Sequence, residues 1–292
     1  MEITYDKEYT DVLVNNIVER YGGSGVRRTG THVSDLLYCL MKAWGKHNIP
    51  EDQWLEEDIE DSPMLMWSQG LQFEDLIGTG QPQVPTAYCP SCNAVSAVPL
   101  PTIHADGTHE EVSKCSVCHD RWIIGTPDYR NEEIIHEAKQ TRKSQRRGLD
   151  NAPWWIEQLQ SYILFDHIRN PDVPIWGRLV VNWLMGDYGS KRKGERPRPP
   201  RSAIEAFKVK FTADELILWR DELLRRKSIV EGAEMPALTG MGVGDAIEGM
   251  GERSPAYDWE CSSCPVGKAL HCENWLWDDD DNEIILGGTD ED

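Results

Sequence analysis

Two carboxylates and a lysine in one short segment are the residues of this chain best suited to chemistry. In GTPDYRNEEIIHEAKQT, residues 125–141, they are Asp128, Glu137 and Lys139. The pattern predicts two short strands joined by a tight turn around Asn131. Side chains alternate along a strand, so Glu137 and Lys139 would share one face, and a hairpin would bring Asp128 beside Glu137. Two carboxylates that close are costly unless a cation binds them, so we expect a site for Mg²⁺ or Mn²⁺.

The lysine gives this expected site a reaction. An ammonium group beside a metal and a water can position or deprotonate the water and stabilise charge that develops on a phosphate. The three residue types together therefore predict hydrolysis of a phosphodiester. The alternative is that residues 137–139, Glu-x-Lys, form an exposed strand face with a cross-strand ion pair.

Two predicted helices supply further polar side chains. Gln158 and Tyr162 are four residues apart in WWIEQLQSYILF, so they would lie on one face of a helix. Glu74 follows Gly70 by four residues in a second helical pattern, over residues 64–78. Glu74 would then supply a third carboxylate, unless it is an ordinary glutamate on a helix surface.

With these segments the chain resembles the PD-(D/E)XK nucleases of the RecB-like branch. The family motifs occur in the expected order, as GLQFE at 70–74, GTPD at 125–128, EAK at 137–139 and QLQSY at 158–162. The resemblance covers roughly residues 30–85 and 120–275. It implies an α/β fold in which a mixed central sheet is flanked by helices.

The resemblance also implies roles for the motif residues. Glu74, Asp128 and Glu137 would be the metal ligands, and Lys139 would be the catalytic lysine. Gln158 and Tyr162 would orient DNA or the active site. The implied activity is a metal-dependent deoxyribonuclease, most simply an exonuclease that prefers single strands. An endonuclease and a non-catalytic nucleic-acid-binding protein are the alternatives.

Four cysteines in the middle of the chain have the spacing of a metal site. They form two C-x2-C pairs separated by 22 residues, Cys89 and Cys92, then Cys115 and Cys118. Two such knuckles suit one tetrahedral Zn²⁺, because four thiolates complete its coordination. We therefore predict an inserted zinc ribbon, either purely structural or also in contact with DNA or a protein.

Three late cysteines and one early cysteine form a second group, Cys261, Cys264, Cys272 and Cys39. This pattern around a RecB-like core resembles the iron–sulfur members of the family, which include AddB-type nucleases and the CRISPR-associated exonucleases called Cas-four. The resemblance implies a 4Fe-4S cluster that fastens the two ends of the domain together. A second zinc site is one alternative, and a buried core cysteine at position 39 is another.

The periodicity predicts further elements and a division of the chain. Helices are expected over 31–44, capped by Ser34, over 154–168, and over 211–232 from Thr212, with a buried strand over 176–185. Trp154 and Trp155 would belong to the core or stack on bases. We expect a helical part of the nuclease domain at 1–85, the ribbon at 86–120, the nuclease core and iron–sulfur clasp at 121–277, and a disordered acidic tail at 278–292.

Charge and hydropathy bound the partners. The 292 residues carry a formal net charge of -20, and 39% are hydrophobic, enough for a core. Two basic strips, residues 139–147 and 191–210, would contact a phosphate backbone or be solvated loops. We therefore expect DNA as partner, single-stranded or with free ends, alongside recombination or helicase proteins. No stretch is apolar and long enough to predict a membrane span, so we expect a soluble, cytoplasmic protein.

Overall fold

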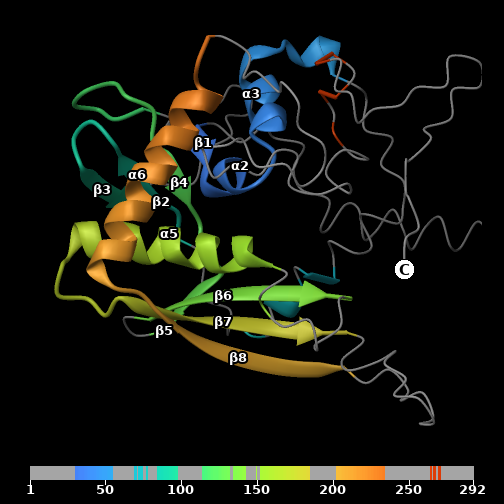
Figure 1. The fold of residues 1–292 in the computed structure, drawn as a ribbon, viewed down its shortest axis with the longest axis vertical. Helices are drawn as coiled ribbons and strands as arrows, with labels where there is room; N and C mark the ends of the chain where they lie inside the picture. The colour runs from blue at the N-terminus through green and yellow to red at the C-terminus, as the bar shows by residue number, and fades with distance from the viewer. Residues whose placement is uncertain are drawn as a thin grey trace, which may run out of the picture. The chain divides into compact units, whose positions relative to one another are not determined.

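The structure of the protein is a computed structural model. It describes residues 30–54, 69–70, 72–74, 77, 84–97, 114–131, 134–142, 149, 152–184, 202–233, 264, 266–267 and 269–270 (Figure 1). The chain divides into two compact units. The first comprises Met1–Gly30 and Ile59–Trp219, and the second comprises Thr31–Asp58 and Arg220–Asp292.

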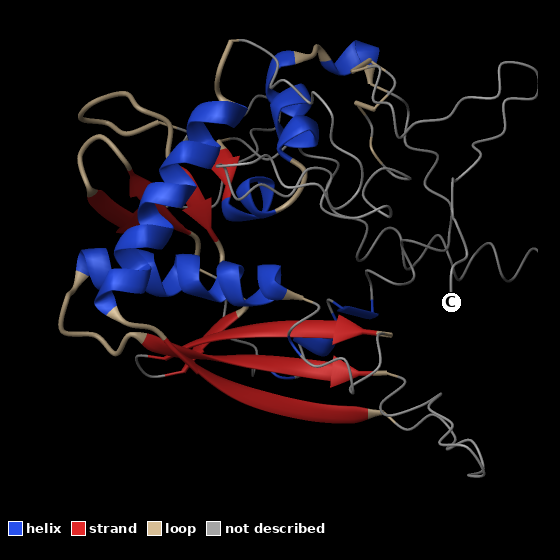
Figure 2. Cartoon of the chain, viewed as in Figure 1, coloured by secondary structure: helices blue, strands red, loops and turns tan. Residues whose placement is uncertain are grey.

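The first unit contains a small antiparallel sheet and a larger mixed one. In the small sheet β2 (Thr86–Cys89) pairs with β3 (Ala94–Ala97) on one side and with β4 (Ile123–Gly125) on the other. The larger sheet has the order β5 (Tyr129–Asn131), β6 (Ile134–Thr141), β7 (Trp176–Trp183) and β8 (Ala203–Lys210). Its β6–β7 pair is parallel and its other pairs are antiparallel, so the expected α/β class with a mixed sheet is confirmed (Figure 2).

Helix α5 (Pro153–Arg169) covers one face of the larger sheet. It begins at Pro153, where the missing N–H has no intrahelical partner to lose. At Gly177 a Cβ atom would come within 2.8 Å of Leu159 Cδ1 and 3.0 Å of the Ile135 carbonyl oxygen. The absence of a side chain at Gly177 therefore lets α5 approach the sheet closely.

Two tryptophans at the start of α5 belong to the core. Trp154 is 4% exposed and Trp155 is 7% exposed. Their rings meet edge to face with centroids 6.0 Å apart, and Trp155 also packs at 6.2 Å from Trp183. Of the two expectations for this pair, the structure supports packing rather than stacking on bases.

The predicted hairpin of residues 121–141 is only partly correct. Its first half is divided between β4 of the small sheet and β5 of the larger one, and only β5 pairs with β6. Asp128 lies in the link between them, after Pro127. Proline cannot donate to a β-ladder, which gives a physical reason for the break.

Strand β8 is an element that the sequence analysis missed. The segment was predicted only as part of a basic strip, although its second half, Phe207-Lys208-Val209-Lys210, alternates between apolar and polar residues. The exposure of its side chains alternates in the same way, so the period of two was the available signal. The prediction of a strand over 176–185 is confirmed by β7.

The second unit contains β1 (Thr31–His32), α2 (Val33–Leu37), α3 (Leu40–Asn48) and the 3₁₀ turn η1 (Glu51–Gln53). Side chains join this early segment to the later one. The indole N–H of Trp44 donates to the Gly232 carbonyl at 2.8 Å, and Arg226 donates to the Leu36 carbonyl at 3.0 Å. Such bonds to buried carbonyls fix the two segments against each other.

The helix expected over 31–44 is wrong in two details. The chain is helical from Val33 rather than capped by Ser34, because the Asp35 carboxylate accepts the His32 N–H at 3.0 Å and so completes the first turn. The helix is then interrupted at Tyr38 and Cys39, both extended, and Cys39 becomes the N-cap of α3. The interruption therefore falls on one of the predicted cluster ligands.

Helix α6 (Ala213–Val230) confirms the last predicted helix and contributes residues to both units. Its start is a capping box, in which Thr212 Oγ1 accepts the Glu215 N–H at 3.2 Å and the Glu215 carboxylate accepts the Thr212 N–H at 2.7 Å. Of the helices in the described ranges, none is long and apolar enough to cross a membrane. The tail at 278–292 lies outside the described residues.

Candidate active site and metal centre

Asp128, Glu137 and Lys139 lie together in the first unit. Glu137 is fully buried on β6, and the Lys139 ammonium group donates a hydrogen bond to its Oε1. The Oδ2 atom of Asp128 accepts the backbone N–H of Ala138 at 2.6 Å. The Glu137 carboxylate is therefore held by the Lys139 side chain. The Asp128 carboxylate is held by the backbone of Ala138, which lies between Glu137 and Lys139.

Burial makes this pair of carboxylates electrostatically costly. It raises the pKa of Glu137 to about 8, an effect that the neighbouring charges of Asp128 and Glu74 reinforce and Lys139 opposes. Burial also raises the pKa of Asp128, against the charge of Lys139 and the Ala138 N–H. Within the described part of the chain, Glu137 Oε2 is buried without a hydrogen-bond partner. A bound cation would be coordinated by Glu137 Oε2 and would offset the negative charges of the Asp128 and Glu137 carboxylates.

Glu74 belongs to the same electrostatic neighbourhood, since its charge contributes to the raised pKa of Glu137. Phe73, the residue before it, is 5% exposed and packs in a small cluster with Ala138 of β6 and Val180 of β7. Residues 69–70, 72–74 and 77 are helical, as the pattern predicted. Phe73 thus anchors the helical segment that carries Glu74 to the larger sheet.

Gln158 and Tyr162 meet on α5, where the Gln158 Nε2 donates to the Tyr162 hydroxyl at 2.9 Å. Tyr162 is 5% exposed, and its ring would lie 2.8 Å from a Cβ atom placed on Gly125. Gly125 ends β4 three residues before Asp128. The pair is therefore packed against the strand that leads into the carboxylate site.

An ion pair that the sequence analysis missed ties α5 to the edge of the same sheet. Arg130 of β5 binds both oxygens of Asp166, with Nη2 and Oδ1 3.0 Å apart, and Asp166 is 4% exposed. Arg169 adds a second contact to Asp166 at 3.1 Å. Arg130 and Asp166 are 36 residues apart, so no local pattern could have paired them.

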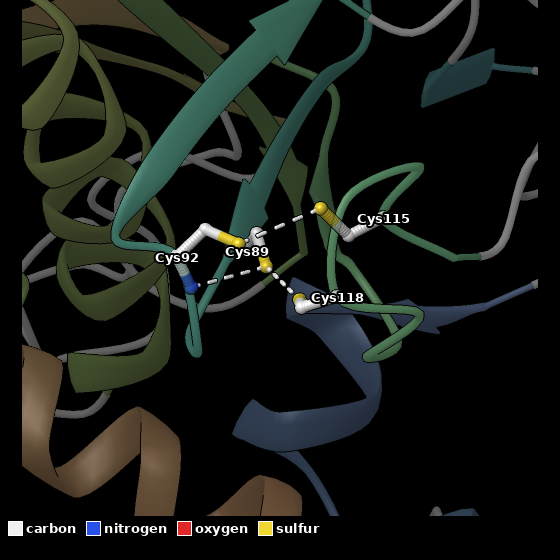
Figure 3. Close-up of side chains that lie close together, drawn as sticks. All are labelled: Cys89, Cys92, Cys115 and Cys118. Atoms are coloured by element: carbon white, nitrogen blue, oxygen red, sulfur yellow. Dashed lines mark hydrogen bonds between the residues drawn. The ribbon is translucent and has the colours of Figure 1, made fainter.

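The four central cysteines converge as predicted. Their Sγ atoms all lie within 4.8 Å of one another. Figure 3 shows the side chains of Cys89, Cys92, Cys115 and Cys118 gathered at one place. The closest pairs are Cys89 with Cys118 at 3.4 Å and Cys92 with Cys115 at 3.9 Å. The Cys92 N–H also points to Cys89 Sγ at 3.4 Å. This cluster of thiols is able to hold a metal ion.

The thiols differ in how readily they ionise. Backbone N–H groups of Cys118 and Val117 lower the pKa of Cys115 to about 7, whereas burial raises the pKa of Cys89. Cys115 therefore ionises more readily than Cys89. A metal would bind all four as thiolates, so its affinity should rise with pH.

The second cysteine group is only half described. Cys39 and Cys264 are both buried in the second unit, while Cys261 and Cys272 lie outside the described residues. Cys264 packs with Val266 and Leu270 against apolar side chains that include Trp44. Burial raises its pKa, against backbone N–H groups and the charges of Lys42 and Lys46 on α3. Burial therefore disfavours a thiolate at Cys264, and the two lysines reduce that cost only in part.

Comparisons with known proteins add little to this geometry. No protein-family model matches the chain, and no curated protein matches it. A solved structure described as "Crystal structure of SSO0001" is similar over 89% of this chain and 94% of that one, at 15% sequence identity and a TM-score of 0.43. A likeness at that level establishes neither a shared fold nor a shared function.

Proposed function

We propose that the chain is a metal-dependent nuclease with a PD-(D/E)XK site formed by Asp128, Glu137 and Lys139. The observation that carries this proposal is the buried Glu137, which pairs with Lys139 through one oxygen and leaves the other without a partner among the described residues. A fully buried acid beside two further carboxylates is an expensive arrangement for a merely structural role. A divalent cation relieves that cost.

The side chains present divide the work of phosphodiester hydrolysis between them. Asp128 and Glu137, with Glu74 nearby, would hold Mg²⁺ or Mn²⁺. The cation would offset negative charge on the phosphate and lower the pKa of the attacking water. Lys139 would orient that water and stabilise charge that develops on the phosphate. The buried position of Glu137 keeps competing water away from the carboxylates.

Activity on labelled DNA tests this assignment. Purified protein is incubated with end-labelled single-stranded DNA, end-labelled duplex and a circular single strand, with Mg²⁺ or Mn²⁺. We expect cleavage that chelation stops, and a loss of about 10²-fold or more in Lys139→Ala and Glu137→Gln. End-labelled but not circular DNA should be cut if the enzyme is an exonuclease, and cutting of the circle would identify an endonuclease.

Glu205→Gln is the matched control, because Glu205 is a carboxylate on the neighbouring strand β8. It accepts the Trp183 indole N–H at 2.9 Å, and a glutamine retains an acceptor there. The control should cut as fast as the wild type. Undiminished cutting by both site variants, or no cutting of any substrate by folded, metal-loaded protein, would overturn the nuclease assignment.

We also propose the identity of the bound metals. Four thiolates with tetrahedral spacing favour Zn²⁺ at Cys89, Cys92, Cys115 and Cys118, in a ribbon built on β2 and β3. The resemblance stated above favours a 4Fe-4S cluster on Cys39, Cys261, Cys264 and Cys272. Anaerobically purified protein should then contain zinc, iron and sulfide together. Cys264→Ser should lose iron and colour but retain zinc, and zinc with no iron or sulfide would refute the cluster.

A further inference from the structure

The face of the larger sheet opposite α5 carries a different set of side chains from the carboxylate face. Side chains alternate along β6, so Glu137 and Lys139 point to the face that α5 covers. His136 and Ala138 point to the opposite face. The register places Arg178 beside His136 and Lys208 beside Arg178. Charge is therefore segregated through the sheet.

Basic and aromatic groups gather at one end of this second face. The Lys208 ammonium lies 3.8 Å from the centroid of the Trp176 ring, and the Arg178 guanidinium lies 5.5 Å from it. Lys210 is the register partner of Trp176 and is exposed, as is Lys208. Farther along the same strand as the two lysines, Ile204 shares the face and is 61% exposed.

No acidic side chain balances these cations on the strand positions of this face that the structure describes. The acids of β6 and β8, Glu137 and Glu205, alternate onto the other face. His136 is 3% exposed, and its ring stacks on Tyr129 with centroids 4.2 Å apart. The patch is positive in a chain of net charge -20.

Part of the same face is covered. Phe73 packs on Ala138 and Val180 there. The exposed part is the β7–β8 end, with Trp176, Lys208 and Lys210, which are residues of one strand pair. A rigid ladder of paired strands therefore presents an indole and two lysines at fixed spacing.

We propose that this exposed face, formed by Trp176, Arg178, Lys208 and Lys210, is a binding platform for single-stranded nucleic acid. The cations match a phosphate backbone, and the indole offers a surface on which an unpaired base stacks. A cation–π contact at an exposed site is weak, so a base can displace Lys208 from the ring and release its ammonium group to a phosphate. Duplex bases are already stacked on one another, so the platform favours single strands.

The platform is distinct from the carboxylate site and does not require cleavage. The platform would bind the nucleic acid on one face of the sheet, while Glu137 and Lys139 lie on the other face. The test is therefore a binding measurement in the absence of divalent cation, where no cleavage is expected. Loss of binding then reports on the platform alone, and loss of cleavage with divalent cation present reports on the proposed nuclease site.

Fluorescence anisotropy with a labelled oligo(dT) and an abasic strand of the same length separates stacking from charge. The wild type should bind oligo(dT) more tightly than the abasic strand. Trp176→Ala should weaken oligo(dT) binding about tenfold and remove the difference between the two strands. Trp176→Phe should keep most of the difference, since it retains a ring, and circular dichroism checks that both variants are folded.

The lysines are tested by the salt dependence of binding. Lys208→Ala and Lys210→Ala should each reduce the slope of log affinity against log salt by about 0.7, the value for one phosphate contact on a single strand. Arg220→Ala is the control, because this arginine of α6 has 34% of its side chain exposed and pairs with Asp221. Its slope should equal that of the wild type.

Three results would overturn the platform. One is equal binding of the oligo(dT) and abasic strands by the wild type. Another is an unchanged salt slope in both lysine variants. The third is binding of an acidic polyglutamate peptide as tight as that of oligo(dT), which would make the face a site for acidic protein segments instead.

Discussion

The cysteine cluster and the carboxylate cluster are both suited to a cation, but they are assembled in different ways. Each C-x2-C pair closes over two intervening residues, and a backbone N–H already points to Cys89 Sγ. The carboxylates come from a link, a strand and a separate helix, and burial raises the pKa values of Asp128 and Glu137. Local turns bring the thiols together, so the cysteine cluster is in place before metal binds. The tertiary fold brings the carboxylates together, so without a cation their buried like charges destabilise the folded protein.

The largest expected effect is the loss of a thiolate. In Cys89→Ser the remaining ligands cannot hold Zn²⁺ tightly, and structural zinc in small modules contributes about 10 kcal/mol or more of apparent binding energy at neutral pH. We expect the zinc bound per protein chain to fall below the wild-type value, and residues 86–121 to become sensitive to protease. Val117→Ser is the control in the other knuckle, between Cys115 and Cys118, since Val117 is 79% exposed. Full zinc in Cys89→Ser would mean that this cluster is not a metal site.

A glycine that supports both clusters should give the next effect. Gly125 pairs with Thr86, at the start of the strand that ends at Cys89, and it precedes Asp128 by three residues. In Gly125→Ala the new methyl group would meet the Tyr162 ring at 2.8 Å, so we expect a loss of about 1–3 kcal/mol in the free energy of unfolding.

The control for that substitution is Gly70→Ala, on a helix. A Cβ atom at Gly70 meets nothing within 4 Å, and alanine favours a helix more than glycine does. Denaturant unfolding of the two variants should therefore move in opposite directions. A loss of stability in Gly70→Ala as large as in Gly125→Ala would remove the steric explanation.

The pH dependence of stability distinguishes the carboxylate cluster. The folded-state pKa of Glu137, about 8, is above its ordinary value of 4.5, so the folded protein retains a proton that the unfolded chain releases. Stability in the absence of divalent cation should fall as pH rises from about 4.5 to about 8. Glu137→Gln cannot ionise, and we expect it to exceed the wild type by about 1–2 kcal/mol above pH 8.

Thermal unfolding measured from pH 5 to pH 9, with and without Mg²⁺, checks this sign. The cation should restore most of the wild-type stability at high pH and leave Glu137→Gln nearly unchanged. Parallel curves for the two proteins without the cation would show that Glu137 ionises at its ordinary pKa, and the strained-site description would then be wrong.

The smallest expected effect comes from the hydrogen bond on α5. Tyr162→Phe removes the hydroxyl that accepts from Gln158, while the ring that packs on Gly125 remains. We expect a loss of about 0.5–1.5 kcal/mol in unfolding free energy. If the pair also orients DNA, cleavage should fall by more than this stability loss explains, in Tyr162→Phe and Gln158→Ala alike. Unchanged cleavage would restrict the pair to packing.

Local signals in the sequence determined much of this protein. Spacing alone predicted the convergence of the four central cysteines, because each knuckle is a turn of a few residues. Helical periodicity and capping residues predicted α5, with Pro153 at its first position, and α6, with Thr212 before it. Alternation predicted that Glu137 and Lys139 share a face. Each of these depends on interactions between residues close in sequence.

Tertiary structure alone decided the properties that depend on distant residues. The division of the 121–141 hairpin between two sheets depends on the pairing of β4 with β2, and the pKa of Glu137 depends on burial beneath elements that no local pattern places. The Arg130–Asp166 pair and the basic face around Trp176 likewise join residues from separate elements. Long-range packing sets these contacts, and a linear pattern does not encode which strand becomes the neighbour of which.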